Sequence, residues 1–164
     1  MLLDSIKKDY QNLSKIIVIN GPGSFTGIRT GITAAKVLGL SLKLPVCGIS
    51  LFELLRINYL KTKPKKNLKF FIKLNKYNYF AQNISKSGKE SEIILESFGA
   101  NLQYKSKEVD LVFLDNISGK NTSRKVNDKE EIITINDLFN KTYRDLINLS
   151  EKKYIPSPIY VKTF

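Results

Sequence analysis

A strand, a glycine turn and a helix follow one another between Lys15 and Leu42, and no other stretch constrains the fold as strongly. Ile16 to Ile19 are four consecutive apolar residues, which is typical of a strand that is buried on both faces of a sheet. The next four residues, Asn20-Gly21-Pro22-Gly23, predict a type II turn. In such a turn Pro22 sets φ at the first central position, and Gly23 adopts the positive φ that the next position needs. The chain is therefore expected to reverse sharply before the helix begins.

The helix that follows is expected from about Gly27 to Leu42, with Ser24 or Thr26 as its cap. One ridge of this helix carries almost no side-chain volume, because small residues recur at every fourth position. Glycine in a helix interior costs about 1 kcal/mol relative to alanine, so a close neighbour must offset the loss. That neighbour is either the sheet of the same domain or another helix, from this chain or from a partner. The ridge consists of Gly27, Gly31, Ala35 and Gly39, with Ile28, Ile32, Leu38 and Leu42 on its flanks.

Histidine is absent from all 164 residues, and this absence excludes several kinds of active site. A histidine metal site, a Ser-His or Cys-His nucleophile pair and an imidazole general base all need that side chain. The 15 Asp and Glu residues show no paired spacing that marks a carboxylate site. Cys47 lies in the apolar run from Pro45 to Ile49, where a buried strand cysteine is expected rather than a reactive thiol. The sequence thus predicts no catalytic residue, no metal site and no cofactor.

The net charge of +12 would suit a nucleic acid or an acidic partner. However, few of the basic residues are arginine, and the lysines are scattered along the chain. This distribution favours solvated lysine faces over a dedicated binding patch. The chain contains no run of eighteen apolar residues and no signal sequence at Met1, so we expect a soluble, cytoplasmic protein without a membrane partner.

A lysine-rich run with a proline, Lys61 to Asn67, is the clearest change in composition and predicts a boundary between two lobes. We place the N-terminal lobe at residues 1–62 and the second lobe at 63–164, with the final segment able to return to the first. An amphipathic helix is expected over residues 2–12, because apolar side chains recur there at helical spacing, namely Leu2, Leu3, Ile6 and Tyr10. The remaining predicted elements are strands at 45–49, 68–74, 77–84, 92–98, 109–114 and 132–135, helices at 51–60 and 137–149 with Asn136 as the cap of the latter, a loop at 117–131 and an extended tail at 154–161.

The glycine turn also resembles phosphate-binding loops, because helix N-termini with unpaired N–H groups attract anions. A Walker A loop needs Lys and then Ser or Thr after its last glycine, whereas Gly27 is followed by Ile28 and Arg29. For a dinucleotide fingerprint, the spacing of the glycines is one residue too long. The turn therefore predicts only a weak anion or nucleotide site, formed by Gly21, Gly23, Ser24, Thr26 and Gly27.

The run from Gly21 to Gly31, GPGSFTGIRTG, continues through the small-residue helix to Leu44-Pro45-Val46-Cys47-Gly48-Ile49-Ser50. This whole run resembles the signature of the TsaB family, formerly called YeaZ. Two weaker similarities support it: Leu2 to Ile19 resembles the helix and strand that precede the signature, and Pro158 to Lys162 resembles the closing Pro-x-Tyr-Leu-Arg element. Between residues 68 and 150 only the order of the elements is similar.

The resemblance implies an α/β, actin-like and Hsp70-like (RNase H-like) fold with two lobes. Members of the family are non-catalytic partners of the related TsaD subunit, which with the ATPase TsaE builds threonylcarbamoyladenosine beside the tRNA anticodon. The resemblance therefore implies a TsaD-like partner, a TsaE-like ATPase and tRNA met through the complex, with a homodimer left open. The family's partner surface is built from N-terminal helices, which implies contacts from Leu2, Leu3, Ile6, Tyr10, Gly27, Ile28, Gly31, Ile32, Ala35 and Gly39.

The chain departs from the family pattern in two places. Members normally begin with a strand of Ile-Asp-Thr-Ser type and a β-meander, and this chain starts after them. The first lobe is thus expected to be truncated, with an open edge beside Lys15 to Ile19, so that either the chain is a shortened form or a partner completes the sheet. In addition, Lys73 to Tyr79 lacks the acidic and arginine positions of the family's Asp-Ala-Arg-x-x-Glu-Val-Tyr segment.

Three functions follow from these patterns. The leading one is a non-catalytic scaffold subunit that binds a TsaD-like catalytic partner in threonylcarbamoylation of tRNA. The second is a nucleotide-binding, ATPase-like protein that uses the glycine loop. The third is a direct tRNA-binding module, whose affinity for tRNA would depend steeply on salt.

Overall fold

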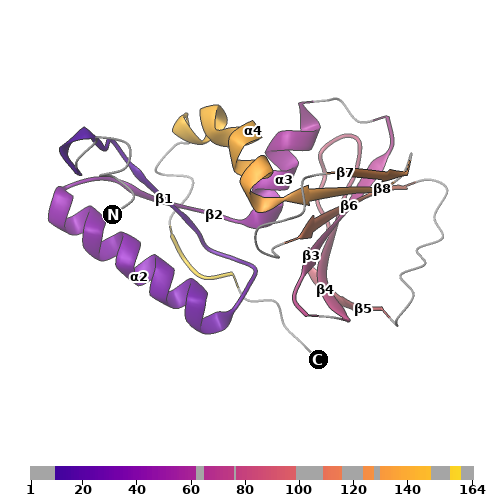
Figure 1. Cartoon of the computed structure of the whole chain (residues 1–164), viewed down its shortest axis with the longest axis horizontal. Helices are drawn as coiled ribbons and strands as arrows, with labels where there is room; N and C mark the ends of the chain where they lie inside the picture. Colours follow the sequence, from indigo (N-terminus) through magenta and orange to yellow (C-terminus); the bar gives the residue numbers. More distant parts are fainter. Residues whose placement is uncertain are drawn as a thin grey trace. The chain divides into compact units, whose positions relative to one another are not determined.

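The computed structural model describes residues 10–61, 65–75, 77–98, 109–115, 124–127, 130–148 and 156–159. These residues form an α/β structure that divides into two compact units, drawn in Figure 1. Unit 1 comprises Met1–Ser50 and Leu146–Ile159, and unit 2 comprises Leu51–Asp145 and Tyr160–Phe164. The sequence places the boundary between residues 62 and 63, whereas these units divide the chain after Ser50.

The described part of unit 1 contains a β-α-β unit, in which one helix connects two parallel strands. Strand β1 (Ile16–Ile19) leads through the glycine turn into α2 (Phe25–Leu42), and α2 leads into β2 (Val46–Ile49). The strands pair in parallel register from Ile16 opposite Val46 to Ile19 opposite Ile49, and α2 packs against both of them. A short 3-10 helix, η1 (Tyr10–Asn12), precedes β1.

Strand β1 is less buried than its sequence predicts. Its four residues are all half-buried, whereas a run of four apolar residues predicts burial on both faces. The reason is that the sheet of unit 1 contains two strands within the described residues, so β1 has a neighbour along one edge. Ile16 N donates to Pro45 O and Asn20 N donates to Ile49 O, so alternate backbone groups of β1 point toward β2.

The turn between β1 and α2 differs from the predicted type II turn. The peptide bond between Gly21 and Pro22 is cis, and the positive φ of 127° belongs to Gly21 rather than to Gly23. The residue with the left-handed backbone lies against Ile159. A Cβ on Gly21 would stand 3.1 Å from the Ile159 carbonyl oxygen, so both the conformation and the available space favour glycine there.

Residues 156–159 close unit 1 from the far end of the chain. Ile159 N donates a hydrogen bond to Asn20 O at 2.8 Å, directly after β1. Pro156 lies over Gly48 of β2, where a Cβ would stand 2.6 Å from the Pro156 Cα. Both strands of unit 1 are therefore in contact with a segment that is distant in sequence.

Unit 2 is a six-stranded mixed sheet with the strand order β5-β4-β3-β6-β8-β7. Strands β3, β4 and β5 form an antiparallel meander, β6 and β8 run parallel to β3, and β7 is antiparallel to β8. Helices α3 (Leu51–Leu60) and α4 (Ile135–Ile147) lie on the same side of the sheet in Figure 1. The strands are β3 (Asn67–Lys73), β4 (Asn78–Ile84), β5 (Ile94–Ser97), β6 (Val109–Asp115), β7 (Arg124–Asn127) and β8 (Glu130–Thr134).

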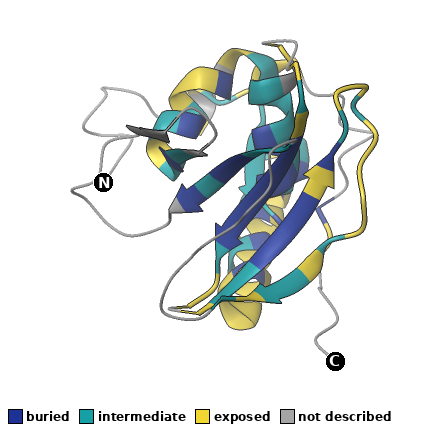
Figure 2. Ribbon diagram, turned by 90° about the vertical axis from the view of Figure 1, so that its right-hand side faces the viewer, coloured by how far each residue is buried: buried dark blue, intermediate teal, exposed yellow. Residues whose placement is uncertain are grey.

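The two faces of this sheet carry separate clusters of aromatic residues. On the face toward α3, the Phe70 ring lies 5.5 Å from the Tyr59 ring, between centroids. On the other face, Phe71 stacks on Phe113 at 4.8 Å and meets Phe98 edge to face at 5.5 Å. Neighbouring residues of β3 thus serve opposite faces, as the period of two in a strand requires. Figure 2 shows the largely buried central strands in dark blue.

Most predicted elements are confirmed to within one or two residues. They are the helices at 27–42 and 51–60 and the strands at 45–49, 68–74, 77–84 and 109–114. The predicted helix at 2–12 falls mainly outside the described residues, apart from η1, and so does half of the tail at 154–161, namely the residues on either side of 156–159.

Three predictions in the second half of the chain are wrong in part. Strand β5 is shorter than the predicted strand at 92–98. Strand β7 lies within the segment predicted as a loop, because its sequence Arg-Lys-Val-Asn shows no apolar alternation. Helix α4 starts at Ile135 because Thr134 rather than Asn136 caps it: Asp137 N donates to Thr134 Oγ1 at 3.2 Å, and Thr134 Oγ1 donates to Asp137 Oδ2 at 2.7 Å.

Candidate functional site

The C-terminal half of the ridge of small residues on α2, at Ala35 and Gly39, faces the strands of its own unit. Ile28, Ile32, Ala35 and Gly39 are buried, and a Cβ on Gly39 would stand 2.2 Å from Val46 Cγ2 on β2. The close neighbour that the ridge requires is therefore this chain's own sheet, one of the two alternatives that the sequence leaves open. This corrects the expectation that these four residues offer an open surface, because a second polypeptide could cover them only if α2 left its sheet.

The other residues predicted to contact a partner are distributed differently. Gly27 is exposed, and Gly31 is half-buried, with Val18 Cγ2 3.9 Å from the position of a Cβ. Tyr10 in η1 is 38% exposed. Leu2, Leu3 and Ile6 lie outside the described residues. Gly27 and Tyr10 are thus the most accessible described members of the predicted set.

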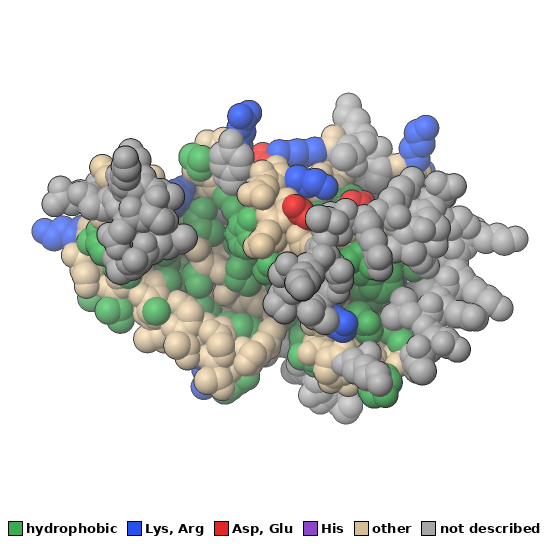
Figure 3. Space-filling view, viewed as in Figure 1, with side chains coloured by type: hydrophobic (Ala, Val, Ile, Leu, Met, Phe, Trp, Pro, Cys, Tyr) green, Lys and Arg blue, Asp and Glu red, His purple; other side chains and the backbone are tan. Residues whose placement is uncertain are grey.

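The opposite face of α2 is exposed and carries no charge along the length of the helix. Val37 is 59% exposed and Leu40 is 83% exposed, although both have large apolar side chains. The residues around them are small or carry hydroxyl groups, in a chain of which 26% is charged. Figure 3 shows this part of the molecule covered mainly by hydrophobic and other uncharged side chains. We name this surface the outer face of α2; it comprises Thr26, Gly27, Thr30, Thr33, Ala34, Val37, Leu40 and Ser41.

Both charged residues of α2 stand on one flank of the outer face. Arg29 and Lys36 are exposed and lie about two helical turns apart. The Arg29 guanidinium carbon is 4.0 Å from the centre of the Phe25 ring, one turn earlier on the same flank. The negative ring face attracts the cation and so holds the guanidinium group close to the helix. We name Phe25, Arg29 and Lys36 the basic flank of α2.

Val37 and Leu40 are absent from the contacts predicted from sequence, although the sequence carries a signal for them. If the ridge through Gly31, Ala35 and Gly39 meets the sheet, residues half a turn away must face outward. Val37 and Leu40 are large apolar residues at such positions, and no neighbour within α2 covers them. To identify Val37 and Leu40 as exposed residues, one must know which side of the helix packs on the sheet, and the sequence does not show this.

The glycine turn is arranged as a helix cap. Ser24 Oγ accepts a hydrogen bond from Gly27 N at 3.4 Å, which assigns the cap to Ser24 rather than to Thr26. Gly21 is covered by Ile159, so the start of the turn is closed to a ligand. Of the residues predicted to form a weak anion site, Gly21 is buried, and Gly23, Ser24, Thr26 and Gly27 are exposed.

Asn20 is a buried polar residue at the carboxyl end of β1. Its side chain is 7% exposed, and its Oδ1 has no hydrogen-bond partner in the described part of the chain. Its Nδ2 lies 3.1 Å from the position of a Cβ on Gly48, a position that Pro156 also approaches. Asn20 therefore belongs to the contact with the 156–159 segment.

The described residues contain no grouping that points to catalysis or metal binding. No three Cys, Asp or Glu side chains among them are grouped so as to hold a metal ion, and Cys47 is fully buried. Burial raises the pKa of the Tyr59 phenol well above its ordinary value, and the neighbouring Glu131 carboxylate raises it further. Tyr59 thus stays protonated and packs against Phe70. None of the helices within these ranges is both long enough and apolar enough to cross a membrane.

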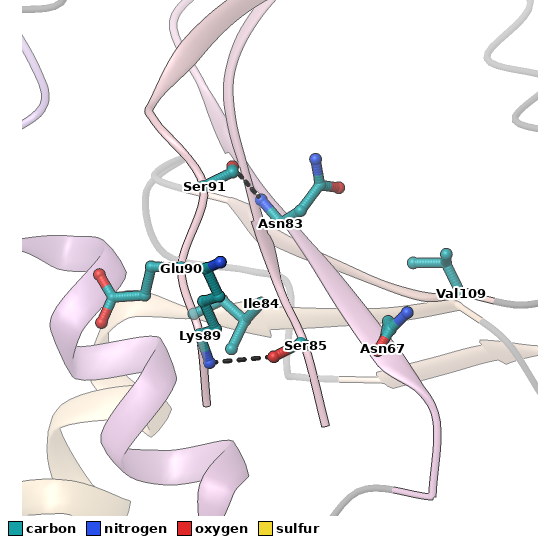
Figure 4. A pocket seen from close by; sticks show the side chains of 8 residues that line it. All are labelled: Asn67, Asn83, Ile84, Ser85, Lys89, Glu90, Ser91 and Val109. Atoms are coloured by element: carbon teal, nitrogen blue, oxygen red, sulfur yellow. Dashed lines mark hydrogen bonds between the residues drawn. The ribbon is translucent and has the colours of Figure 1, made fainter. Parts of the chain in front are cut away.

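Unit 2 has an open cavity of about 440 Å³ beside the end of β4. Figure 4 shows the loop that follows β4 along one side of it, where Ser91 Oγ accepts a hydrogen bond from Asn83 N at 3.0 Å. Glu90 points away toward α3, where its carboxylate pairs with Arg56 at 3.0 Å. The polar groups of this loop therefore hold the loop itself in place.

A family model described as TsaD: tRNA N6-adenosine threonylcarbamoyltransferase matches residues 1–67. Two curated relatives carry the name tRNA threonylcarbamoyladenosine biosynthesis protein TsaB. The protein from Bacillus subtilis (strain 168) is 47% identical over 57 residues, which are 35% of this chain and 25% of the relative. The protein from Buchnera aphidicola subsp. Schizaphis graminum (strain Sg) is 37% identical over 67 residues, which are 41% of this chain and 32% of the relative. The chain thus matches about a quarter to a third of the length of these relatives.

Two solved structures from Pseudomonas aeruginosa have the same fold. One is an uncharacterized protein with similarity to peptidase YEAZ, with a TM-score of 0.57 and 16% sequence identity. The other is YeaZ, with a TM-score of 0.55 and 15% identity. Each comparison covers 98% of this chain and 79% of the solved chain. The α/β structure is therefore of the actin-like, RNase H-like type.

Proposed function

We propose that the chain, which is similar to TsaB (YeaZ) proteins, is a non-catalytic scaffold subunit that binds a TsaD-like catalytic partner in threonylcarbamoylation of the adenosine beside the tRNA anticodon. The observation that carries the proposal is the outer face of α2, an exposed and uncharged surface on the helix of the family signature. The name of the curated relatives, which refers to tRNA threonylcarbamoyladenosine biosynthesis, supports the pathway. In this proposal the chain carries out no chemistry itself.

An exposed apolar face gains free energy when a second protein covers it. Burying a leucine or valine side chain fully is worth about 1.5–3 kcal/mol. Leu40 and Val37 are mostly exposed, so much of this gain is still available. The small residues Ala34 and Ser41 beside them allow a second helix to approach to the usual separation of about 8–10 Å between helix axes. The outer face therefore fits a partner helix laid along α2.

The other partners follow from the same proposal. A TsaE-like ATPase would join through the complex, and tRNA would be met through the complex rather than by this chain alone. A homodimer formed through the outer face of α2 would compete with the TsaD-like subunit, because each copy of the chain has one such face.

The proposal is tested with Leu40→Asp in the full chain and the TsaD-like subunit of the same organism. Since Leu40 is 83% exposed, we expect the fold to persist. A carboxylate buried at the contact should weaken binding at least about tenfold, which corresponds to about 1.4 kcal/mol. Isothermal titration calorimetry measures the affinity, and circular dichroism checks the fold. The matched control is Ile147→Asp, because Ile147 is also apolar and 62% exposed but lies on α4.

Two results would contradict the proposal at different points. If Leu40→Asp binds as tightly as the wild type, the partner does not use the outer face of α2. If the folded wild type shows no affinity for the TsaD-like subunit, the proposed partner is wrong.

The nucleotide-binding alternative would use the glycine turn at the N-terminus of α2. The exposed Ser24 and Thr26 at a helix N-terminus support it. Two contacts oppose it, because Ser24 Oγ already accepts from Gly27 N and because Ile159 covers Gly21. Calorimetry with ATP and Mg²⁺ distinguishes the two functions: tight binding that is lost in Ser24→Ala or Thr26→Ala would favour the alternative.

A further inference from the structure

The open cavity beside the end of β4 is large enough for a small molecule. Its volume is about 440 Å³, and sites for small molecules typically have about 300–1,000 Å³. All the residues that line it belong to unit 2. Three strands and one loop contribute them: Asn67 begins β3, Asn83 and Ile84 end β4, Val109 begins β6, and Ser85, Lys89, Glu90 and Ser91 follow β4.

Two asparagines and a valine share one face of the sheet at this cavity. Asn67 is opposite Val109 in the pairing of β3 with β6, and Lys69 is opposite Asn83 in the pairing of β3 with β4. Residues two apart in a strand point to the same face, so Asn67, Asn83 and Val109 lie on one face. Figure 4 shows these three side chains on the side of the loop away from Glu90. Two amide groups thus lie beside an apolar side chain.

The hydroxyl and carboxylate groups that line the cavity already have partners. Ser91 Oγ donates a hydrogen bond to Glu92 O at 2.8 Å. Ser85 Oγ lies 2.8 Å from a neighbouring serine hydroxyl. The Glu90 carboxylate pairs with Arg56 at 3.0 Å, so its negative charge is compensated. These groups therefore offer a ligand little further hydrogen bonding.

The side chains of Asn67, Asn83 and Lys89 keep hydrogen-bonding groups for a ligand. Asn67 Oδ1 accepts from Lys86 N at 3.1 Å, so its Nδ2 group remains without a partner in the described part of the chain. The Asn83 amide and the Lys89 ammonium group have no partner among those residues either. All three side chains are exposed. Most of the available groups are N–H donors, and Lys89 is the one cation among the eight lining residues.

We propose that this cavity binds a small organic carboxylate that carries an apolar group. Carboxylate oxygens accept hydrogen bonds, and bonds from an ammonium group such as that of Lys89 are charge-assisted. Asn67 and Asn83 supply amide N–H groups, and Ile84 and Val109 supply apolar surface. One cation matches the single charge of a carboxylate, whereas a phosphate monoester carries about −1.5 to −2 at pH 7. This inference goes beyond the proposed function and does not depend on it.

Benzoate and benzamide test the inference, because they have nearly the same shape and only benzoate is charged. The full chain is titrated with each probe and followed by ¹H–¹⁵N NMR. Benzoate should bind at least about tenfold more tightly than benzamide at low salt. It should also shift the side-chain amide signals of Asn67 and Asn83. The signal of Asn83 is identified by its loss in Asn83→Asp.

Two substitutions in the cavity should weaken the binding of benzoate. Asn83→Asp introduces a like charge, and Lys89→Gln removes the cation, so each should raise the Kd at least about tenfold. Lys89→Arg keeps the charge and should keep the affinity. Asn75→Asp is the matched control for the added charge, because Asn75 lies in the turn at the other end of the β3–β4 hairpin. There an aspartate can still accept from the backbone N–H groups of Tyr77 and Asn78. Circular dichroism checks the fold of each variant.

Equal affinity for benzoate and benzamide would overturn the inference, and so would a titration in which benzoate shifts neither amide signal. Benzoate binding that both Asn83→Asp and Lys89→Gln leave unchanged would place the anion elsewhere and would also refute it. If phenyl phosphate binds more tightly than benzoate, the assignment to a carboxylate is wrong. None of these results bears on the TsaD-like partner, because the outer face of α2 belongs to unit 1.

Discussion

At the scale of single residues, Gly48 shows how an absent side chain contributes to unit 1. The Pro156 backbone passes over Gly48 so closely that a Cβ would stand 2.6 Å from the Pro156 Cα. The Asn20 amide nitrogen lies 3.1 Å from the same position. Glycine is therefore needed at this position of β2 for space, whereas Gly21 also needs its positive φ.

We expect Gly48→Ala to lower the free energy of unfolding by about 1–3 kcal/mol, because an added methyl group in a filled core forces its neighbours to move. Equilibrium urea denaturation followed by circular dichroism measures the loss. Gly23→Ala is the control, since the nearest atom there is a flexible Ile28 side-chain carbon at 3.7 Å. The control should change stability by less than about 0.5 kcal/mol. Equal losses in the two variants would rule out a steric cause at Gly48.

Residue-level prediction succeeded for Cys47 and failed for the glycine turn. The apolar residues around Cys47 predict a buried strand position, and this thiol is fully buried. The positive φ was assigned to Gly23, because a local turn rule assigns it to the residue after a proline. In the structure it belongs to Gly21, which lies against Ile159. No local pattern contains that distant neighbour, so the turn could not be derived from its own four residues.

At the scale of the element, α2 is stabilised at its start by a side-chain cap and along one side by the sheet. Ser24 Oγ satisfies one backbone N–H of the first turn. The left-handed Lys43 ends the helix, where its N–H is directed at the carbonyl groups of Gly39 and Leu40. Both ends of α2 are thus capped and its inner face packs on the sheet. The outer face is the part of α2 that is left exposed.

Ser24→Ala should lower the free energy of unfolding by about 1 kcal/mol, because the Gly27 N–H loses its acceptor. Urea denaturation monitored at a helix-sensitive wavelength measures the change. Thr26→Ala is the matched control, since Thr26 is exposed and is not the cap. That variant should stay within about 0.5 kcal/mol of the wild type. A larger loss for Thr26→Ala than for Ser24→Ala would contradict the assignment of the cap.

The sequence predicts the existence and the bounds of α2 well. It does not predict which side of the helix is buried. Residues at every fourth position identify a ridge, but both a sheet and a partner helix can cover a ridge of small residues. The contact of Gly39 with Val46 decides between them, and it depends on the tertiary structure. The sequence does not predict strand β7 for a related reason: this strand forms by pairing with β8, and its own sequence carries no strand pattern.

At the scale of the whole molecule, the positive charge is spread over both units and partly neutralised. The net charge of +12 remains after all 15 acidic residues are counted, and some of those acidic residues pair with lysines of unit 2. Lys61 pairs with Asp145, and Lys66 pairs with Asp110 at 3.4 Å. Lys69, which is buried in β3, pairs with Glu96. These pairs support the interpretation of the lysines as solvated or locally compensated charges rather than as one nucleic-acid surface.

The chain alone should therefore bind tRNA only in the weak, non-specific range, with a Kd above about 1 µM at physiological salt. We expect similar affinity for an unrelated duplex DNA of equal charge, because phosphate contacts carry no sequence information. Filter binding at two salt concentrations, with and without the TsaD-like subunit, makes the comparison. Tight binding by the isolated chain that is selective for tRNA would favour the direct tRNA-binding alternative.

The fold class could be predicted for the whole molecule, whereas the lobe boundary between residues 62 and 63 stays a prediction. The resemblance of the run from Gly21 to Ser50 to a family signature implies an α/β structure of the actin-like type, and the solved structures share the fold. The lysine-rich run was the only visible boundary signal, yet the units divide the chain after Ser50. Pro156 and Ile159 contact unit 1, in keeping with the expectation that the final segment can return to the first lobe.

The contact between residues 156–159 and the strands of unit 1 has a consequence for protein synthesis. The strands and α2 leave the ribosome early, but Asn20 and Gly48 meet Ile159 and Pro156 only after the long intervening segment has been translated. At about 5–20 residues per second, β1, α2 and β2 must wait at least about 5 seconds for residues 156–159. A chain that ends before residue 156 would leave Asn20 and Gly48 without these contacts, so we expect its first strands to be less stable.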